Sequence, residues 1–104
     1  MRQFAAVLAL AAAGQFAASP ALAQDPNLAR NLAANCANCH GSNGHAVPGA
    51  GMEPLAGEDK AKLARRLKEY RSGVRPATVM HQISKGYTDE QIELIAGYLA
   101  AQKK

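Results

Sequence analysis

The chain has 104 residues, and its twelve lysine and arginine side chains exceed the eight aspartate and glutamate side chains by four charges at pH 7. This modest positive charge suits an acidic partner surface. It is too small, and too little interleaved with aromatic residues, to predict a nucleic-acid-binding protein.

The N-terminal residues 1–23 have the pattern of a secretory signal peptide. A basic residue and a continuous apolar segment precede the small-x-small sequence "ALA" at residues 21–23. The apolar segment is shorter than the roughly 20 residues that a membrane-spanning helix needs, so we expect cleavage rather than retention as an anchor. The mature domain is then expected to comprise residues 24–104, to have no membrane span and to reside in the periplasm.

The rest of the chain predicts helices joined by loops rich in glycine and proline. No segment shows the alternation typical of a strand, so the predicted fold is all-α, with one small domain. Residues 41–57 are predicted to form an irregular loop. The expected helices cover residues 25–41, 58–73, 77–86 and 88–104.

Local signals define the ends and faces of these helices. Asp25 is a candidate N-cap with Pro26 in the first turn, and Gly73 is expected to end the second helix. Thr88 and Gln91 have the spacing of a capping box at the start of the last helix. Apolar residues at helical spacing predict the buried faces of the second and last helices: Leu63, Leu67, Tyr70, Ile92, Ile95, Ala96 and Leu99.

Both cysteines of the chain lie in the sequence "CANCH", where His40 directly follows Cys39. A disulfide to Cys36 would close a very small loop and would stabilise the fold little. A thioredoxin-like dithiol needs a preceding strand, and a structural zinc site needs a second pair of ligands, so neither is favoured.

The spacing C-x-x-C-H is instead typical of covalent haem attachment. Two thiols on one helical turn can reach the two vinyl groups along a haem edge, and the imidazole of His40 then points at the iron. A haem would also supply an apolar centre that so short a chain otherwise lacks.

The second axial ligand has several candidates. Met52 and His45 lie in the short loop after His40, which would have to wrap around the haem edge to reach its other face. Met80 follows a complete helix, a separation that easily spans the macrocycle, and we favour it over His81 and over a purely packing role. His81 is expected to be an exposed neighbour of the haem edge, and His45 to be merely solvated.

Taken together, these segments resemble a class I c-type cytochrome: "CANCHG", a glycine-rich loop, "PLAG", "YRSG", "PATVM" and a C-terminal helix. Within that class, "RPATVMHQISKGYTDEQIELIAGYLA" is most similar to the cytochrome subunit of flavocytochrome c sulfide dehydrogenases. The resemblance implies one haem c bound covalently by Cys36 and Cys39, with His40 as the proximal and Met80 as the distal ligand. It implies an electron-transfer protein, not itself an enzyme, that accepts electrons from a flavoprotein dehydrogenase subunit oxidising sulfide.

Other roles remain open at this point. Some family members carry two haem domains, whereas this chain has a single C-x-x-C-H, and single-haem relatives also serve as free carriers or as subunits of other sulfur-oxidising enzymes. A haem protein with a labile sixth ligand is a further alternative, although no acid–base pair marks a distal pocket. Three residues are secondary candidates for packing against the haem: Pro54, Leu55 and Leu63. Five basic residues either attract an acidic partner or form a solvated helix face: Arg65, Arg66, Lys68, Arg71 and Arg75.

Overall fold

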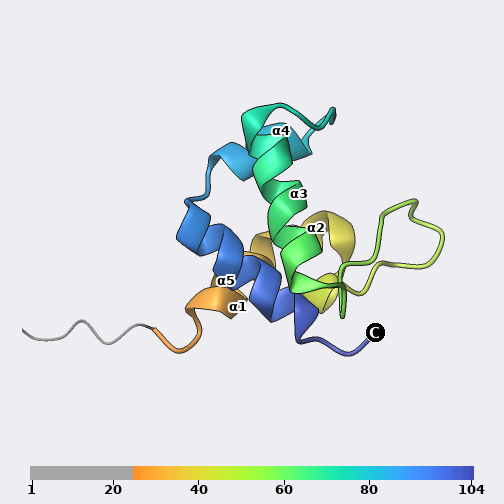
Figure 1. Cartoon of the computed structure of the whole chain (residues 1–104). Coiled ribbons are helices and arrows are strands. Elements are labelled where there is room, and N and C mark those ends of the chain that lie inside the picture. Colours follow the sequence, from red (N-terminus) through yellow and green to blue (C-terminus); the bar gives the residue numbers. More distant parts are fainter. Residues whose placement is uncertain (1–24) are drawn as a thin grey trace, which may run out of the picture.

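The computed structural model describes residues 25–104, and the expected signal peptide lies outside the described residues. The chain folds into helices, as predicted, and residues 25–104 contain no strand (Figure 1). The α-helices and the short 3-10 helices (η) are α1 (Leu28–Ala33), η1 (Ala34–Cys36), α2 (Ala37–His40), η2 (Ser42–Gly44), α3 (Lys60–Ser72), α4 (Met80–Lys85) and α5 (Asp89–Ala100).

The first helix begins later than the sequence predicts. Asn27, not Asp25, is the N-cap of α1, and it makes no side-chain capping bond. The carboxylate of Asp25 instead accepts a hydrogen bond from the backbone N–H of Asn27 at 2.8 Å, and its carbonyl accepts one from Leu28 at 3.0 Å. These bonds form a turn around Pro26, so the side chain of Asp25 is used in that turn and not at the helix end.

The predicted C-terminal end of α3 and the predicted start of α5 are confirmed, whereas α5 ends at Ala100 and not at residue 104 as expected. Gly73 ends α3 with a φ of 82°, in the left-handed region that favours glycine. The Thr88 hydroxyl accepts from the N–H of Gln91 at 3.1 Å, and the Gln91 side chain accepts from the N–H of Thr88 at 3.0 Å. This capping box fixes the start of α5.

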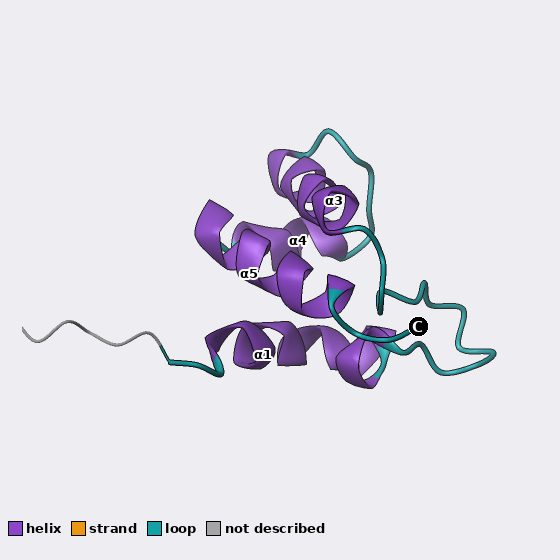
Figure 2. Cartoon of the chain, turned by 60° about the horizontal axis from the view of Figure 1, so that its bottom comes forward, coloured by secondary structure: helices purple, strands orange, loops and turns teal. Residues whose placement is uncertain are grey.

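Helix α5 lies at the centre of the fold. It packs against both α1 and α3, while α4 packs against α3 (Figure 2). The predicted stripe of α5 is buried, together with Ala33 and Leu63 from the neighbouring helices. No helix formed by the described residues is long and apolar enough to cross a membrane.

The long loop between η2 and α3 extends away from the helices and then returns to them (Figure 1). On its return, the N–H groups of Leu55 and Ala56 donate to the carbonyl of Gly44, at 2.9 and 3.1 Å. The N–H of Gly57 then donates to the carbonyl of Leu99 at 2.9 Å. The base of the loop is therefore tied to α5, which places residues 52–55 beside the "CANCH" segment.

Candidate functional site

A cavity of about 480 Å³ opens between the "CANCH" segment, the long loop and helices α3, α4 and α5. All four site residues predicted from the sequence, Cys36, Cys39, His40 and Met80, border this central cavity. Its volume is within the range of sites that hold small molecules and cofactors. Most of its other lining side chains are apolar, and they include Leu55, Leu63, Leu67, Val79, Ile83, Ile95 and Leu99.

The imidazole of His40 is held in one tautomer. Its Nδ1 lies 2.7 Å from the backbone carbonyl oxygen of Glu53. Because a carbonyl oxygen only accepts, Nδ1 must carry the proton of a neutral ring, which leaves the lone pair of Nε2 free to bind a metal. This arrangement, in which the other ring nitrogen donates to a carbonyl, is the usual support of a histidine ligand.

Both cysteines are free thiols, Cys36 half-buried and Cys39 exposed. Burial raises the pKa of the Cys36 thiol above its ordinary value. A redox-active dithiol needs a lowered thiol pKa, so the surroundings of Cys36 do not favour that chemistry. A structural zinc site would need further His, Cys, Asp or Glu ligands, and residues 25–104 contain no cluster of three such side chains that could hold a metal ion.

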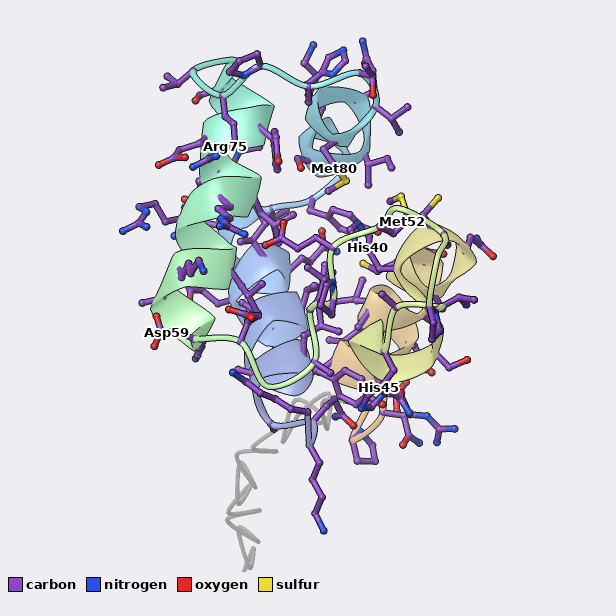
Figure 3. The ribbon with its side chains drawn as sticks, turned by 90° about the vertical axis from the view of Figure 1, so that its right-hand side faces the viewer. His40, His45, Met52, Asp59, Arg75 and Met80 are labelled. Carbon is purple, nitrogen blue, oxygen red and sulfur yellow. The ribbon has the colours of Figure 1, made fainter. Side chains whose placement is uncertain are left out.

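Two methionines, Met52 and Met80, border the central cavity. Met52 lies on its rim with 38 % of its surface exposed, and Met80 lies at the first position of α4, half-buried. Figure 3 shows both side chains close to His40. The short loop was expected to make it difficult for Met52 to reach the other face of a haem. The loop folds back at Leu55 and carries Met52 to the border of the cavity.

Neither of the other two histidines borders the central cavity. His45 is exposed, as expected, but it does more than contact solvent: its Nδ1 lies 3.1 Å from the carbonyl oxygen of Ser42 and its Nε2 lies 2.5 Å from that of Lys103. His81 is half-buried, with a buried Nδ1 that has no hydrogen-bond partner among the described residues, so the expectation of an exposed side chain was wrong.

Only two of the three residues expected to pack against the haem lie at the cavity. Leu55 and Leu63 border the cavity, whereas Pro54 is exposed and does not line it. Sequence reasoning missed Glu53 altogether and took Arg66 only as part of a basic surface. Their side chains form an ion pair of 2.6 Å at the cavity, and no local pattern signals a pair that joins a loop to a helix.

The basic residues of α3 are engaged in ion pairs. Each cation proposed to attract a partner contacts a carboxylate: Arg65 and Arg75 share Glu69, Lys68 pairs with Glu93, Arg71 with Asp89, and Arg66 with Glu53. Glu93 also contacts Lys60, at 3.9 Å. The surface formed by α3 and by Arg75, which follows it, is therefore a network of paired charges and not a row of free cations.

Comparisons with known proteins identify the family of the chain. A family model described as "Cytochrome C oxidase, cbb3-type, subunit III" matches residues 23–99. The cytochrome subunit of sulfide dehydrogenase of Chlorobaculum tepidum is 34% identical over 73 residues, which are 70% of this chain and 64% of that protein. The thiosulfate dehydrogenase electron acceptor of Stutzerimonas stutzeri is 35% identical over 66 residues, 64% of this chain and 31% of the relative. Cytochrome c-554(548) of Halomonas halodenitrificans is 35% identical over 72 residues, 65% of this chain and 84% of the relative.

The chain thus spans about a third of the Stutzerimonas protein and just under two thirds of the Chlorobaculum subunit. The resemblance found in the sequence is confirmed, both to c-type cytochromes and to the cytochrome subunit of sulfide dehydrogenase. The helical fold is consistent with the class I type. The chain belongs to the cytochrome c family, through the domain described as "Cytochrome C oxidase, cbb3-type, subunit III".

Proposed function

We propose that the protein is a mono-haem c-type cytochrome that carries single electrons. One observation carries the proposal: two free thiols, an imidazole Nε2 without a proton and a methionine thioether all border a single, largely apolar cavity. These are the groups that covalent attachment and axial ligation of haem c require. In this proposal Cys36 and Cys39 form the thioethers, and His40 and Met80 are the axial ligands.

The side chains have distinct tasks in this assignment. Haem supplies one-electron Fe(III)/Fe(II) chemistry when it is bound. His40 presents Nε2, and the carbonyl of Glu53 keeps its ring in the correct tautomer. The apolar residues Leu55 and Leu63 exclude water from the site. The thioether of Met80 would occupy a haem-iron position that an added ligand could otherwise take, which would suit electron transfer and not substrate binding.

Met80 is preferred to Met52 because of its backbone support. Met80 begins helix α4, which packs against α3. Met52 follows Gly49 and Gly51, where an added Cβ would meet nothing within 4 Å, so its part of the loop has few neighbours. A ligand carried by a packed helix is held in place more precisely than one carried by an open loop.

The partner is proposed from the relatives. One relative is named a thiosulfate dehydrogenase electron acceptor and another the cytochrome subunit of sulfide dehydrogenase. We therefore propose a sulfur-oxidising enzyme as electron donor, with a flavoprotein dehydrogenase subunit as one form of it. A free carrier that serves a terminal oxidase is the second candidate. In its favour, this chain covers 84% of a relative whose name, cytochrome c-554(548), mentions no enzyme complex.

A periplasmic location completes the proposal. It is supported by the signal-peptide pattern of residues 1–23 and by the need for haem attachment outside the cytoplasm, where the mature chain would meet its partners. Detection of a mature form beginning at Gln24 in a periplasmic extract tests this part, and recovery of the uncleaved chain from membranes would contradict it.

The ligand assignment is tested with the protein produced in a host that attaches haem c. The oxidised wild type should show the weak far-red band of iron–methionine ligation and should not bind carbon monoxide when reduced. Met80→Ala should lose the band and bind carbon monoxide, whereas Met52→Ala should keep the band. Loss of the band in Met52→Ala alone would assign the ligand to Met52. Binding of carbon monoxide by the wild type would support a labile sixth position instead.

A further inference from the structure

We propose that Glu53 and Arg66 form a positioning pair that fixes the orientation of His40 and thereby sets the reduction potential of the protein. The inference rests on the proposed function, because it concerns the ligand that His40 supplies. Neither residue is proposed to contact the iron. Both act through the hydrogen bond that the backbone of Glu53 accepts from His40.

Glu53 contacts two elements at once. Its backbone oxygen lies 2.7 Å from Nδ1 of His40, and its carboxylate Oε1 lies 2.6 Å from Nη1 of Arg66. The residue that holds the imidazole is therefore itself held by an arginine on α3. All three residues border the central cavity.

The stretch of loop before Glu53 has few contacts of its own, and the backbone bonds that tie the loop to the fold begin only at Leu55. Val47 is 62 % exposed, and the backbone at Gly49 and Gly51 has no neighbour within 4 Å of an added Cβ. Glu53 lies between this open stretch and the bonded residues Leu55 and Ala56, so a side-chain anchor limits the motion of its carbonyl further. Arg66 provides the anchor from a packed helix, and only 25 % of its side chain is exposed.

Glu53 and Arg66 form an ion pair with a specific hydrogen-bond geometry. The hydrogen bond to Glu53 raises the pKa of Arg66 above its ordinary value, so its guanidinium stays protonated. A bond between a guanidinium and a carboxylate is short and geometrically specific. Because the Glu53 side chain is about half exposed (53 %), the pair adds little to stability, and we expect its effect on the position of the carbonyl to be the larger one.

The proposal predicts the direction in which the reduction potential changes when the pair is broken. A carbonyl that accepts from Nδ1 makes the imidazole a stronger donor at Nε2, which favours the oxidised metal. Loosening the carbonyl weakens that donation and raises the reduction potential. Both Glu53→Gln and Arg66→Gln should therefore raise it. If only the loss of charge mattered, the two variants would shift the reduction potential in opposite directions: Glu53→Gln would raise it and Arg66→Gln would lower it.

The test compares Glu53→Gln, Arg66→Gln and the double variant in the haem-loaded protein. Two quantities are measured: the reduction potential, and the exchange rate of the His40 Nδ1 proton by NMR in the reduced state. We expect each single variant to speed exchange about tenfold and to shift the redox equilibrium toward the reduced form by up to tenfold, which is about 59 mV. The double variant should equal either single variant, because both break the same link.

Two further variants act as controls. Arg65→Gln removes a cation from the same helix that pairs with Glu69, and it should leave both measurements unchanged. Arg66→Lys keeps the charge and can still contact Glu53, so it should remain closer to wild type than Arg66→Gln. The far-red band shows in each variant that the haem site is intact.

The remaining outcomes overturn the proposal. If Glu53→Gln raised the reduction potential, Arg66→Gln lowered it and neither changed the proton exchange, the effect would be due to charge alone and the positioning role would be refuted. A shift in Arg66→Gln with none in Glu53→Gln would mean that Arg66 contacts the haem carboxylates and does not hold Glu53. Absence of covalent haem c from the wild type would instead refute the proposed function, so the two failures are distinguishable.

Discussion

The imidazole Nε2 of His45 lies 2.5 Å from the carbonyl oxygen of Lys103, and this contact joins the loop after the "CANCH" segment to the C-terminal end of the chain. The contact has a parallel in the hydroxyl of Tyr98, which donates to the side-chain oxygen of Asn43 at 2.7 Å. Together with the Gly57–Leu99 backbone bond, these contacts connect the loop to α5 and to the residues that follow it. The C-terminal residues therefore help to hold the wall of the cavity.

Replacing His45 should weaken this connection. A neutral ring carries one N–H and can donate to one of the two carbonyls that it faces, so His45→Ala should lower the free energy of unfolding by about 1 kcal/mol. His45→Gln keeps an N–H donor and should lose less. Denaturant titration of the haem-loaded protein, followed by circular dichroism, measures both. Equal stability of His45→Ala and wild type would show that the contact is not maintained in solution.

Gly41 allows the chain to turn directly after His40, and its replacement should be severe. Its φ is 82°, and an added Cβ would lie 1.8 Å from the carbonyl oxygen of His45. Gly49 is a matched control, because its φ of 80° is almost the same but an added Cβ would meet nothing within 4 Å. Gly49→Ala should cost about 1–2 kcal/mol for the backbone conformation alone.

The cost of Gly41→Ala should exceed that value clearly, because the loop must also move away from the new methyl group. Unfolding midpoints and the yield of haem-loaded protein give the comparison. If the two alanine variants proved equally stable, the close approach of His45 to Gly41 would be contradicted.

Asp89 should contribute stability that depends on pH. The hydrogen bond from Arg71 lowers the pKa of the Asp89 carboxyl below its ordinary value of about 3.9. The contribution is therefore present in full above that value and is lost as the pH falls through the lower pKa of the folded state. Asp89→Asn should be less stable than wild type at neutral pH, and the difference should disappear in strong acid.

Urea denaturation at a series of pH values tests this expectation. Glu90→Gln is the control, because Glu90 lies in the same first turn of α5 but outside the ion pair with Arg71. If both variants lost their difference from wild type over the same pH range and to the same extent, the effect would belong to the helix end and not to the ion pair.

Short-range patterns account for what the sequence predicted well. The capping box of Thr88 and Gln91 and the glycine end at Gly73 depend only on neighbouring residues, and both are confirmed. The buried stripe of α5 follows from helical spacing, because one face of a central helix must be apolar. The order Cys36, Cys39, His40 is itself a local motif, so the location of the site could be predicted with it.

Contacts between distant segments could not be predicted in the same way. Nothing in the residues around Glu53 indicates that its backbone would meet His40 and its side chain Arg66, because both contacts depend on how the loop folds back. The same folding brings Met52 to the cavity. Loop length limits how far a residue can reach, but it does not tell which direction the chain takes.

The paired cations of α3 and the paired Arg75, which follows that helix, have a consequence for molecular recognition. Arg65 and Arg75 already share the carboxylate of Glu69. An acidic group of a partner protein would therefore have to displace Glu69 before it could pair with either arginine. Association by such exchange gains little from long-range attraction, since charges that cancel locally produce a weak distant field. Electron transfer through this face should therefore change little with ionic strength, and selection among partners would depend on close fit after the first encounter.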